Sequence, residues 1–298
     1  MSNPRIAFRM SSVRPRLSAP FGKPLIVHVV VNVEHWKFDE PMPRAIIPGP
    51  HGFESVPDVP NFAWAEYGMR CGMPRILRSL ADRGIRATAA INAAVIDVYP
   101  EVARAMFDAG WEFMGHGVHQ RSLPSVPDER VVIQQSVRMI EEFTGRRPRG
   151  WLGPGLRETF DSPDILREMG IEYVCDWALD DLPEWLRTDR GWMVALPYSL
   201  DVNDSVLYAV ERHSNPEMYR RVVDAVECFN REVVEQPRIL TMPLHPHLIG
   251  PPHRIIYLDR ILDFLQSRHD TVFLTGSQIA DWYRNAEPPP IDSTRLRA

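Results

Sequence analysis

The sequence contains only three cysteines among its 298 residues, and none of them lies in a CxxC pair. Isolated cysteines in odd number argue against a disulfide framework or a zinc ribbon and are typical of a reducing compartment. No apolar run is long enough to form a membrane-spanning helix. The first 24 residues include four arginines but lack the apolar core of a secretory signal. These absences predict a cytoplasmic protein with no membrane partner.

Signatures of nucleotide and nucleic-acid binding are also lacking. Neither a GxGxxG nor a P-loop pattern follows any predicted strand, which disfavours the open nucleotide-binding folds. The net charge is −5, and acidic and basic residues are interspersed rather than clustered. No nucleic-acid partner is therefore expected. The chain is 44% hydrophobic and 24% charged, values that are usual for a globular protein.

Short β-branched runs alternate along the chain with segments of helical periodicity. Residues 25–31 form a nearly continuous apolar run, which predicts a strand buried on both faces. Residues 129–144 have an apolar helical face and are followed by Gly145, a common helix end. Residues 34–67 are rich in proline and glycine, and a loop of that length is usually functional.

The alternation predicts an α/β fold with a mostly parallel sheet. Seven or eight strand–helix units in about 260 residues favour a closed or nearly closed barrel. We expect residues 1–24 to form an N-terminal arm, residues 25–284 to form one catalytic barrel domain, and residues 285–298 to form a flexible tail. The arm and the many tryptophans suggest a homo-oligomer, a dimer or a tetramer.

Polar side chains follow several of the predicted strands directly. In a (β/α) barrel, the carboxyl ends of the strands meet on one face, where the chemistry takes place. A single strand-end histidine is more often structural, and an Asp-Asp pair before proline can simply cap a turn. The convergence of several such residues nevertheless favours a site. The strand-end residues are Asn32, Glu34, His35, His116, His119, Trp151, Pro154, Gly155, Asp180, Asp181, His245 and His247.

At these positions the chain resembles the polysaccharide deacetylase family, the nodulation-protein-B homology group. The strings "VNVEHW", "EYGMRCGMPRIL", "WEFMGHG", "GWLGPG", "YVCDWALDDLP" and "LHPHLIGPPHR" carry the resemblance, which spans residues 25–284. More narrowly the chain is similar to the branch with cofactor-independent allantoinases and related cyclic-amide hydrolases. The resemblance implies a distorted (β/α) barrel, described as seven-stranded, that hydrolyses carbon–nitrogen bonds other than peptide bonds.

Metal-dependent members of that family have an acidic pair on the first strand, two histidines four residues apart and a late histidine that acts as general acid. Here the acidic pair corresponds to Asn32 and Glu34, or to Glu34 and His35, so one aspartate is missing. Gln120 lies four residues after His116, where the second histidine is expected.

Two mechanisms remain open. In the first, Glu34, His116 and His119 hold a single divalent metal, with zinc expected. In the second, which the missing ligand favours, no metal binds and Glu34 acts as general base on water. His116 or His245 then protonates the leaving nitrogen, and backbone amides of residues 153–155 hold the oxyanion.

The substrate predicted first is a small cyclic amide, ureide or imide. The alternative is a polysaccharide or N-acetyl sugar, and a third reading is an inactive barrel that serves as a binding or scaffold protein. Arg70, Arg157 and Arg254 are candidates to bind a carboxylate or imide oxygen. The residues assigned to catalysis are Glu34, His116, His245 and Asp181. The residues assigned to binding of a small-molecule substrate are Asn32, His35, Arg70, Trp151, Pro154, Gly155, Asp180, His247 and Arg254.

Overall fold

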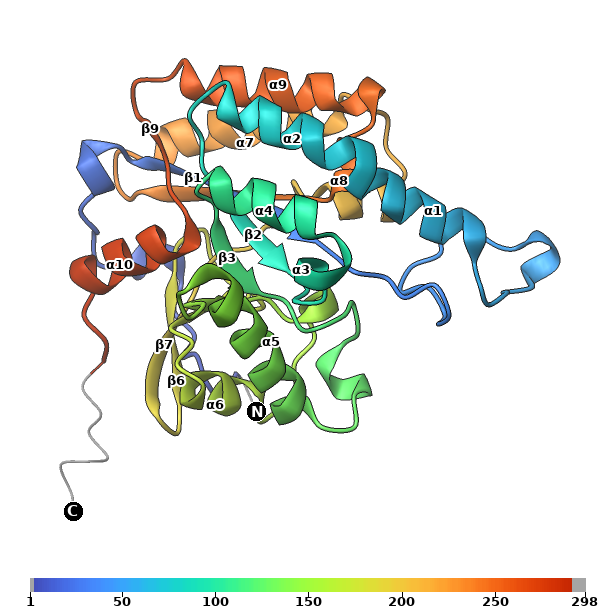
Figure 1. The fold of residues 1–298 in the computed structure, drawn as a ribbon. Helices are drawn as coiled ribbons and strands as arrows, with labels where there is room; N and C mark the ends of the chain where they lie inside the picture. The colour runs from blue at the N-terminus through green and yellow to red at the C-terminus, as the bar shows by residue number, and fades with distance from the viewer. Residues whose placement is uncertain (1–2, 291–298) are drawn as a thin grey trace.

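A computed structural model describes residues 3–290. Within them, nine strands form one sheet in the order β6-β7-β5-β4-β3-β2-β1-β8, and β9 pairs with β1 off this path (Figure 1). All pairs are parallel except the β6–β7 hairpin. The strands are β1 Leu25–Val33, β2 Thr88–Ile91, β3 Glu112–Gly115, β4 Gly150–Trp151, β5 Tyr173–Val174, β6 Glu184–Thr188, β7 Gly191–Ala195, β8 Arg238–Leu244 and β9 Thr271–Phe273.

Helices connect the strands and cover the outside of the sheet. Helices α2, α7 and α9 lie together beside β1 and β8, as Figure 1 shows. No helix within residues 3–290 has both the length and the apolar character needed to cross a bilayer. The α-helices are α1 Val59–Tyr67, α2 Met73–Ala81, α3 Val95–Val98, α4 Pro100–Asp108, α5 Glu129–Thr144, α6 Ser162–Glu168, α7 Glu217–Glu232, α8 Pro246–Ile249, α9 Pro252–Gln266 and α10 Gly276–Ala286.

Strand β1 is buried along its whole length, as its apolar run predicts. Val27, Val29 and Val31 pack against the outer helices. Ile26 and Val30 point to the other side, into a cluster inside the curved sheet. Because both faces of β1 are covered by protein, the strand has no polar alternation, and full burial of each such side chain stabilises the fold by roughly 1.5–3 kcal/mol.

The sheet curves into a barrel that is not closed by strand pairing. Within the described residues, β8 pairs only with β1 and leaves a gap toward the β6–β7 hairpin. Two hydrogen bonds bridge this gap: Thr241 Oγ1 donates to Pro197 O at 2.7 Å, and Ile239 N donates to Asp181 O at 3.0 Å. The predicted α/β fold with a parallel sheet is confirmed, but the expected count of seven strands is not.

Several predicted boundaries need correction. The segment 34–67, expected to be irregular, ends in α1, which continues through a π-helical turn, Gly68–Gly72, into α2. Helix α6 and strand β6 were not predicted.

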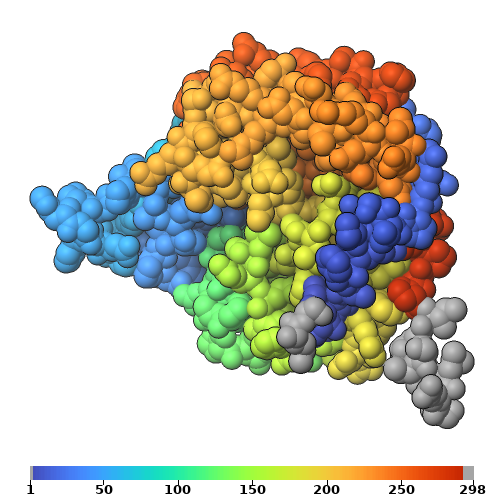
Figure 2. All heavy atoms as spheres, turned by 180° about the vertical axis from the view of Figure 1, so that it is seen from behind, coloured from blue at the N-terminus to red at the C-terminus, as the bar shows by residue number. Residues whose placement is uncertain are grey.

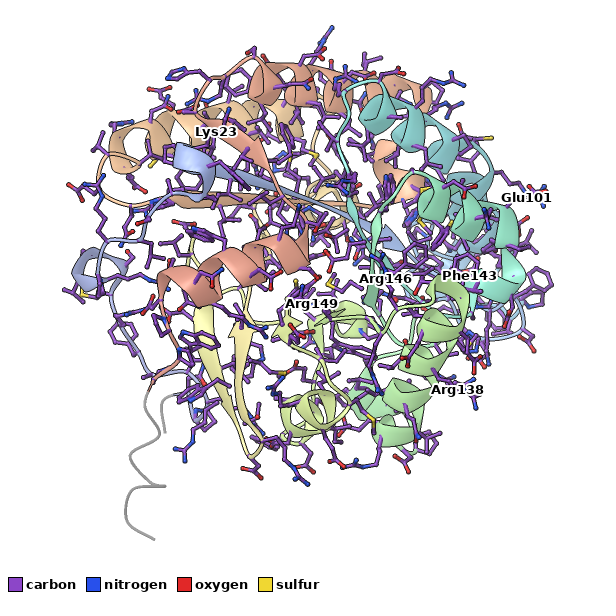
Figure 3. All side chains as sticks on the ribbon, turned by 60° about the vertical axis from the view of Figure 1, so that its left-hand side comes forward. Lys23, Glu101, Arg138, Phe143, Arg146 and Arg149 are labelled. Atoms are coloured by element: carbon purple, nitrogen blue, oxygen red, sulfur yellow. The ribbon has the colours of Figure 1, made fainter. Side chains whose placement is uncertain are left out.

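Helix α10 packs across the amino-terminal end of the barrel. Arg149, labelled in Figure 3, precedes β4 and donates through Nη1 to Asp281 Oδ2 at 3.0 Å. The same guanidinium forms an ion pair with Glu172 at 2.7 Å, just before β5. This link holds α10 against the end of the barrel opposite to the site described below.

The N-terminal arm is fastened to its own chain by Arg14. The guanidinium is fully buried, and it lies 3.1 Å from Glu287 Oε2, 3.4 Å from Glu184 Oε1 and 3.7 Å from Asp180 Oδ2. It also donates to the Tyr283 hydroxyl at 3.0 Å. The arm thus joins the end of α10 to the β6 region. The C-terminal tail was predicted over residues 285–298, of which 291–298 lie outside the described residues.

We expect Arg14→Ala to lower the free energy of unfolding by about 3 kcal/mol, because largely buried carboxylates would lose their shared counter-charge. Urea unfolding followed by circular dichroism measures this change. Arg16→Ala is the matched control, since Arg16 is exposed and its removal is expected to cost less than about 0.5 kcal/mol. Equal losses in the two variants would contradict a structural role for the buried arginine.

Candidate active site

Glu34 lies immediately after β1, at the carboxyl-terminal end of the barrel. Its side chain is only 10% exposed. Trp36 Nε1 donates to Glu34 Oε2 at 3.0 Å, and Gln120 Nε2 donates to Glu34 Oε1 at 2.8 Å. Two neutral donors therefore hold the carboxylate in one orientation.

His116 follows β3 and points its ring toward Glu34. His116 Nδ1 lies 2.6 Å from the Leu152 carbonyl oxygen, which can only accept, so this nitrogen carries the proton. His116 Nε2 lies 3.9 Å from Glu34 Oε1, is buried and has no hydrogen-bond partner among the described residues. A lone pair is thus directed into the site, where a water or substrate proton can meet it.

His245 follows β8 and forms a tight pair with Asp204. The Nδ1–Oδ1 distance is 2.6 Å, and the His245 backbone amide donates to Asp204 Oδ2 at 2.7 Å. His245 Nε2 lies 3.6 Å from Glu34 Oε1. Asp204, which precedes the π-helical turn Val206–Val210, was not among the predicted residues.

The two sides of this ion pair shift each other's pKa. Burial alone would lower the pKa of His245, but Asp204 and Glu34 outweigh it and raise the pKa to about 9. Burial alone would raise the pKa of Glu34, but the neighbouring His116 and His245 outweigh it and hold that pKa well below its usual value. At neutral pH the site therefore contains a carboxylate beside an imidazolium.

Asn92, which sequence reasoning missed, links the loops around Glu34. It follows β2 and is fully buried, and its Oδ1 accepts from the His35 backbone amide at 2.9 Å. Its Nδ2 donates to the His116 carbonyl and, at 3.2 Å, to Gln120 Oε1. This contact fixes the Gln120 amide so that its NH₂ group faces Glu34. Asn92 also stands directly after a strand, so the strand-end rule would have found it.

His119 contacts His35 rather than Glu34. The two Nδ1 atoms lie 2.9 Å apart. Burial, followed by the neighbouring His35, lowers the pKa of His119 to about 4. Gly117 has a positive φ of 74°, a backbone geometry suited to glycine, and the turn there brings Gln120 rather than His119 to the carboxylate.

The donors around Glu34 do not fit a catalytic zinc centre, which uses three protein ligands. Gln120 presents an NH₂ group, and His245 carries a proton that Asp204 stabilises. No group of three or more histidine, cysteine, aspartate or glutamate side chains within residues 3–290 is arranged to hold a metal ion. The metal site expected from Glu34, His116 and His119 is therefore not assembled.

A pocket of about 400 Å³ opens above Glu34. Of the predicted substrate-binding residues, His35, Pro154, Gly155 and His247 line it. Asn32 lies outside this lining and is buried, and its Nδ2 donates to the Tyr198 hydroxyl at 3.0 Å and to Leu244 O at 3.3 Å. Asn32 therefore links β1 to its neighbour β8 and to Tyr198, which follows β7, rather than lining the pocket.

Asp180 and Asp181 do not lie at the site. After β5 the chain runs back toward the amino-terminal end of the barrel, where the Asp181 carbonyl meets Ile239 at the start of β8. Asp180 Oδ1 accepts from Leu182 N at 2.9 Å. This is the turn-capping role that an Asp-Asp pair before proline can have. The assignments of Asp181 to catalysis and of Asp180 to substrate binding are corrected accordingly.

Trp151, Arg70 and Arg254 also lie away from the pocket. Trp151 is fully buried and packs so closely on Gly115 that a Cβ there would lie 2.6 Å from its ring. Arg70 is exposed and pairs with Glu66 on its own helical segment. Arg254 stacks on Tyr208, with 4.2 Å from its guanidinium carbon to the ring centroid. All three have structural contacts instead.

Not every backbone amide of residues 153–155, which were expected to hold the oxyanion, is free to bind it. Gly153 N donates to Asp176 Oδ1 at 2.7 Å, so this amide already has an acceptor. Gly155 remains in the pocket wall. Asp176 is buried beside Glu158, and burial followed by that neighbour raises the pKa of Asp176 well above its usual value.

A curved parallel sheet with a carboxylate, two histidines and a buried aspartate at its carboxyl-terminal end defines a hydrolase of the (β/α)-barrel type. Residues 64–174 match the polysaccharide deacetylase family model. Over these residues the chain matches the polysaccharide deacetylases of the nodulation-protein-B homology group, and it is a hydrolase of non-peptide carbon–nitrogen bonds, as the resemblance implied.

Individual relatives agree with this family. A Schizosaccharomyces pombe protein provisionally named a polysaccharide deacetylase is 27% identical over 75% of this chain and 76% of its own length. Helicobacter pylori peptidoglycan deacetylase is 22% identical over 80% of this chain and 92% of its own length. The solved structure of PuuE allantoinase is 26% identical, covers 97% of this chain and 100% of that chain, and has a TM-score of 0.84. Taken together, the comparisons favour the polysaccharide deacetylase alternative over the cyclic amide predicted first.

Proposed function

We propose that this protein hydrolyses an amide carbon–nitrogen bond with Glu34 as general base and His245 as general acid. The observation that carries the proposal is the 3.6 Å separation of Glu34 Oε1 and His245 Nε2 at the pocket, with opposite charges on the two groups. A base and an acid in their required protonation states stand on the same side of one pocket.

The reaction follows from these contacts. Glu34 removes a proton from water, His116 Nε2 accepts the second water proton as a hydrogen bond, and the water oxygen attacks the amide carbon. The bond to nitrogen then breaks as His245 transfers its proton to the departing nitrogen. Once His245 has given up its proton, it takes the proton that Glu34 holds, because a single proton shared by this pair rests on His245 and leaves Glu34 ionised. The starting state is thereby restored.

The first substrate class that we propose is an N-acetylated sugar or cell-wall fragment. The names of the two curated relatives, a polysaccharide and a peptidoglycan deacetylase, support it. A pocket of about 400 Å³ suits a single ring-sized unit. The reaction would release acetate and leave a free amine.

A small cyclic amide, ureide or imide is the second candidate. The similarity to the allantoinase structure, which extends over nearly the whole of both chains, favours it specifically. The side chains around Glu34 also favour this candidate. Gln120 occupies the place where a metal ligand would be needed to activate an ordinary acetamide.

Both classes can be assayed on protein dialysed against a chelator. Acetate release from N-acetylglucosamine oligomers and ring opening of allantoin, hydantoin and succinimide are the measurements. We expect turnover of at least one class at the same rate before and after metal removal. Activity that returns only when zinc is added back would exclude the metal-free mechanism. Correctly folded protein that turns over none of the substrates would favour the inactive scaffold.

A cytoplasmic location and a dimeric or tetrameric state are also proposed here. The isolated cysteines support a reducing compartment, since Cys71, Cys175 and Cys228 are all free thiols. A segment before and including the start of α1 projects from the body of the molecule (Figures 1 and 2) and exposes Phe53 and Val56. Exposed apolar side chains on such a projection suit contact with a second copy.

A further inference from the structure

Arg44 is a cation in the pocket wall that has no acidic partner among residues 3–290. It lines the pocket together with His245 and His247. Its Nη1 donates to Ser205 Oγ, next to the residue that holds His245. None of the ion pairs formed within residues 3–290 includes Arg44, so most of its five N–H donors are free to meet a ligand.

The two other permanently charged cations of the same wall, Lys37 and Arg121, already have an acidic partner. Lys37 Nζ lies 2.9 Å from Glu40 Oε1, and Arg121 Nη2 lies 2.6 Å from Glu40 Oε2. One carboxylate thus serves two cations. Four positive side chains, Lys37, Arg44, Arg121 and protonated His245, outnumber three carboxylates, Glu34, Glu40 and the Asp204 partner of His245. The excess of positive charge favours an anionic ligand.

His247 provides a second free contact in the same wall. It is 5% exposed, and its Nε2 has no hydrogen-bond partner among the described residues. Burial, followed by the charge of His245, lowers the pKa of His247 to about 3, so the ring is neutral at pH 7. A buried polar atom without a partner is costly, and a bound polar group removes that cost.

We propose that Arg44, with His247 beside it, binds a carboxylate on the substrate. This inference rests on the proposed amide hydrolysis and narrows its substrate class to anionic amides. A guanidinium can donate two parallel hydrogen bonds to a carboxylate, a geometry that lysine cannot copy. Among N-acetyl sugars the preferred unit is one with a carboxylate substituent, and among cyclic amides it is one with an acidic side chain.

Two matched pairs of probes test the preference. N-acetylmuramate differs from N-acetylglucosamine by a lactyl group that carries a carboxylate. Hydantoin-5-acetate differs from 5-methylhydantoin by a carboxylate on the methyl carbon. Calorimetric binding to Glu34→Gln protein avoids turnover during the measurement. We expect the anionic member of one pair to bind about tenfold or more tightly than its neutral counterpart. In the Glu34→Gln/Arg44→Gln double variant this preference is expected to disappear.

Arg121→Gln in the same background is the matched control, because it removes the same charge from the same wall but from a residue that Glu40 already neutralises. It is expected to keep most of the preference. Equal affinity for both members of each pair, or equal losses in the Arg44 and Arg121 variants, would overturn the inference. If wild-type protein hydrolyses neutral amides without an anion preference, the proposed function survives and this inference fails. If no amide is hydrolysed but the Arg44-dependent preference persists, the carboxylate site is supported and the proposed amide hydrolysis fails.

Discussion

Glu34→Gln is expected to lower kcat/KM on the order of 10³-fold, because general-base catalysis typically contributes 10²–10⁴-fold. Glutamine preserves the shape of the side chain and can still accept from Trp36 or Gln120, but it cannot take a proton from water. The loss should fall mainly on kcat, since substrate contacts elsewhere in the pocket are unchanged. Initial-rate kinetics on whichever substrate the panel identifies provide the measurement.

Asp181→Asn is the control for this substitution, since it makes the same carboxylate-to-amide change at the opposite end of the barrel. Its kcat/KM is expected to stay within about twofold of wild type. A large loss in Asp181→Asn together with normal activity in Glu34→Gln would contradict this site and restore the assignment of Asp181 to catalysis. Equal thermal unfolding of both proteins rules out misfolding as the cause.

Asp204→Asn is expected to move the alkaline limit of activity toward acid pH. Activity requires ionised Glu34, whose pKa is well below its usual value, and protonated His245, whose pKa is about 9. The wild-type profile should therefore be flat through neutral pH and fall above about pH 9. Without the aspartate charge, the pKa of His245 falls toward the unperturbed value of about 6.5, and at pH 8 protonation alone lowers the rate about 30-fold.

The pH profile of kcat/KM distinguishes this role from a merely structural one. Asp204→Asn protein should regain much of its activity near pH 6, where His245 is protonated again without help. A misfolded or mispositioned site would lose activity equally at every pH. An alkaline limb that stays near pH 9 in the variant would show that Asp204 does not set the charge of His245.

The strand-end rule predicted that three of the candidate residues lie together, because parallel strands bring their carboxyl ends to one face. Glu34, His116 and His245 are all found there, from β1, β3 and β8. Asp204 was missed because no strand precedes it directly, and it lies just before the π-helical turn Val206–Val210. Local periodicity does not indicate where such a segment lies in space.

The wrong assignments share a different cause, which is the path of loops. Asp180 and Asp181 follow β5 in sequence, but the loop carries Asp181 to the start of β8, where Ile239 N donates to its carbonyl. His119 and Gln120 differ by one residue, and the turn at Gly117 decides which of them meets Glu34. Backbone reversals of this kind depend on tertiary contacts such as the hydrogen bond from Gln120 N to His35 O.

Strand β1 pairs along one edge with β8 and along the other with β2 and β9, so strands from both ends of the chain complete it. During synthesis, roughly 200 residues must emerge between β1 and β8, which takes about 10–40 s at 5–20 residues per second. Throughout that interval, the sequence Leu25–Val33 has one edge without its partner. A nascent chain of this architecture therefore depends on protection of its first strand until its last quarter has been made.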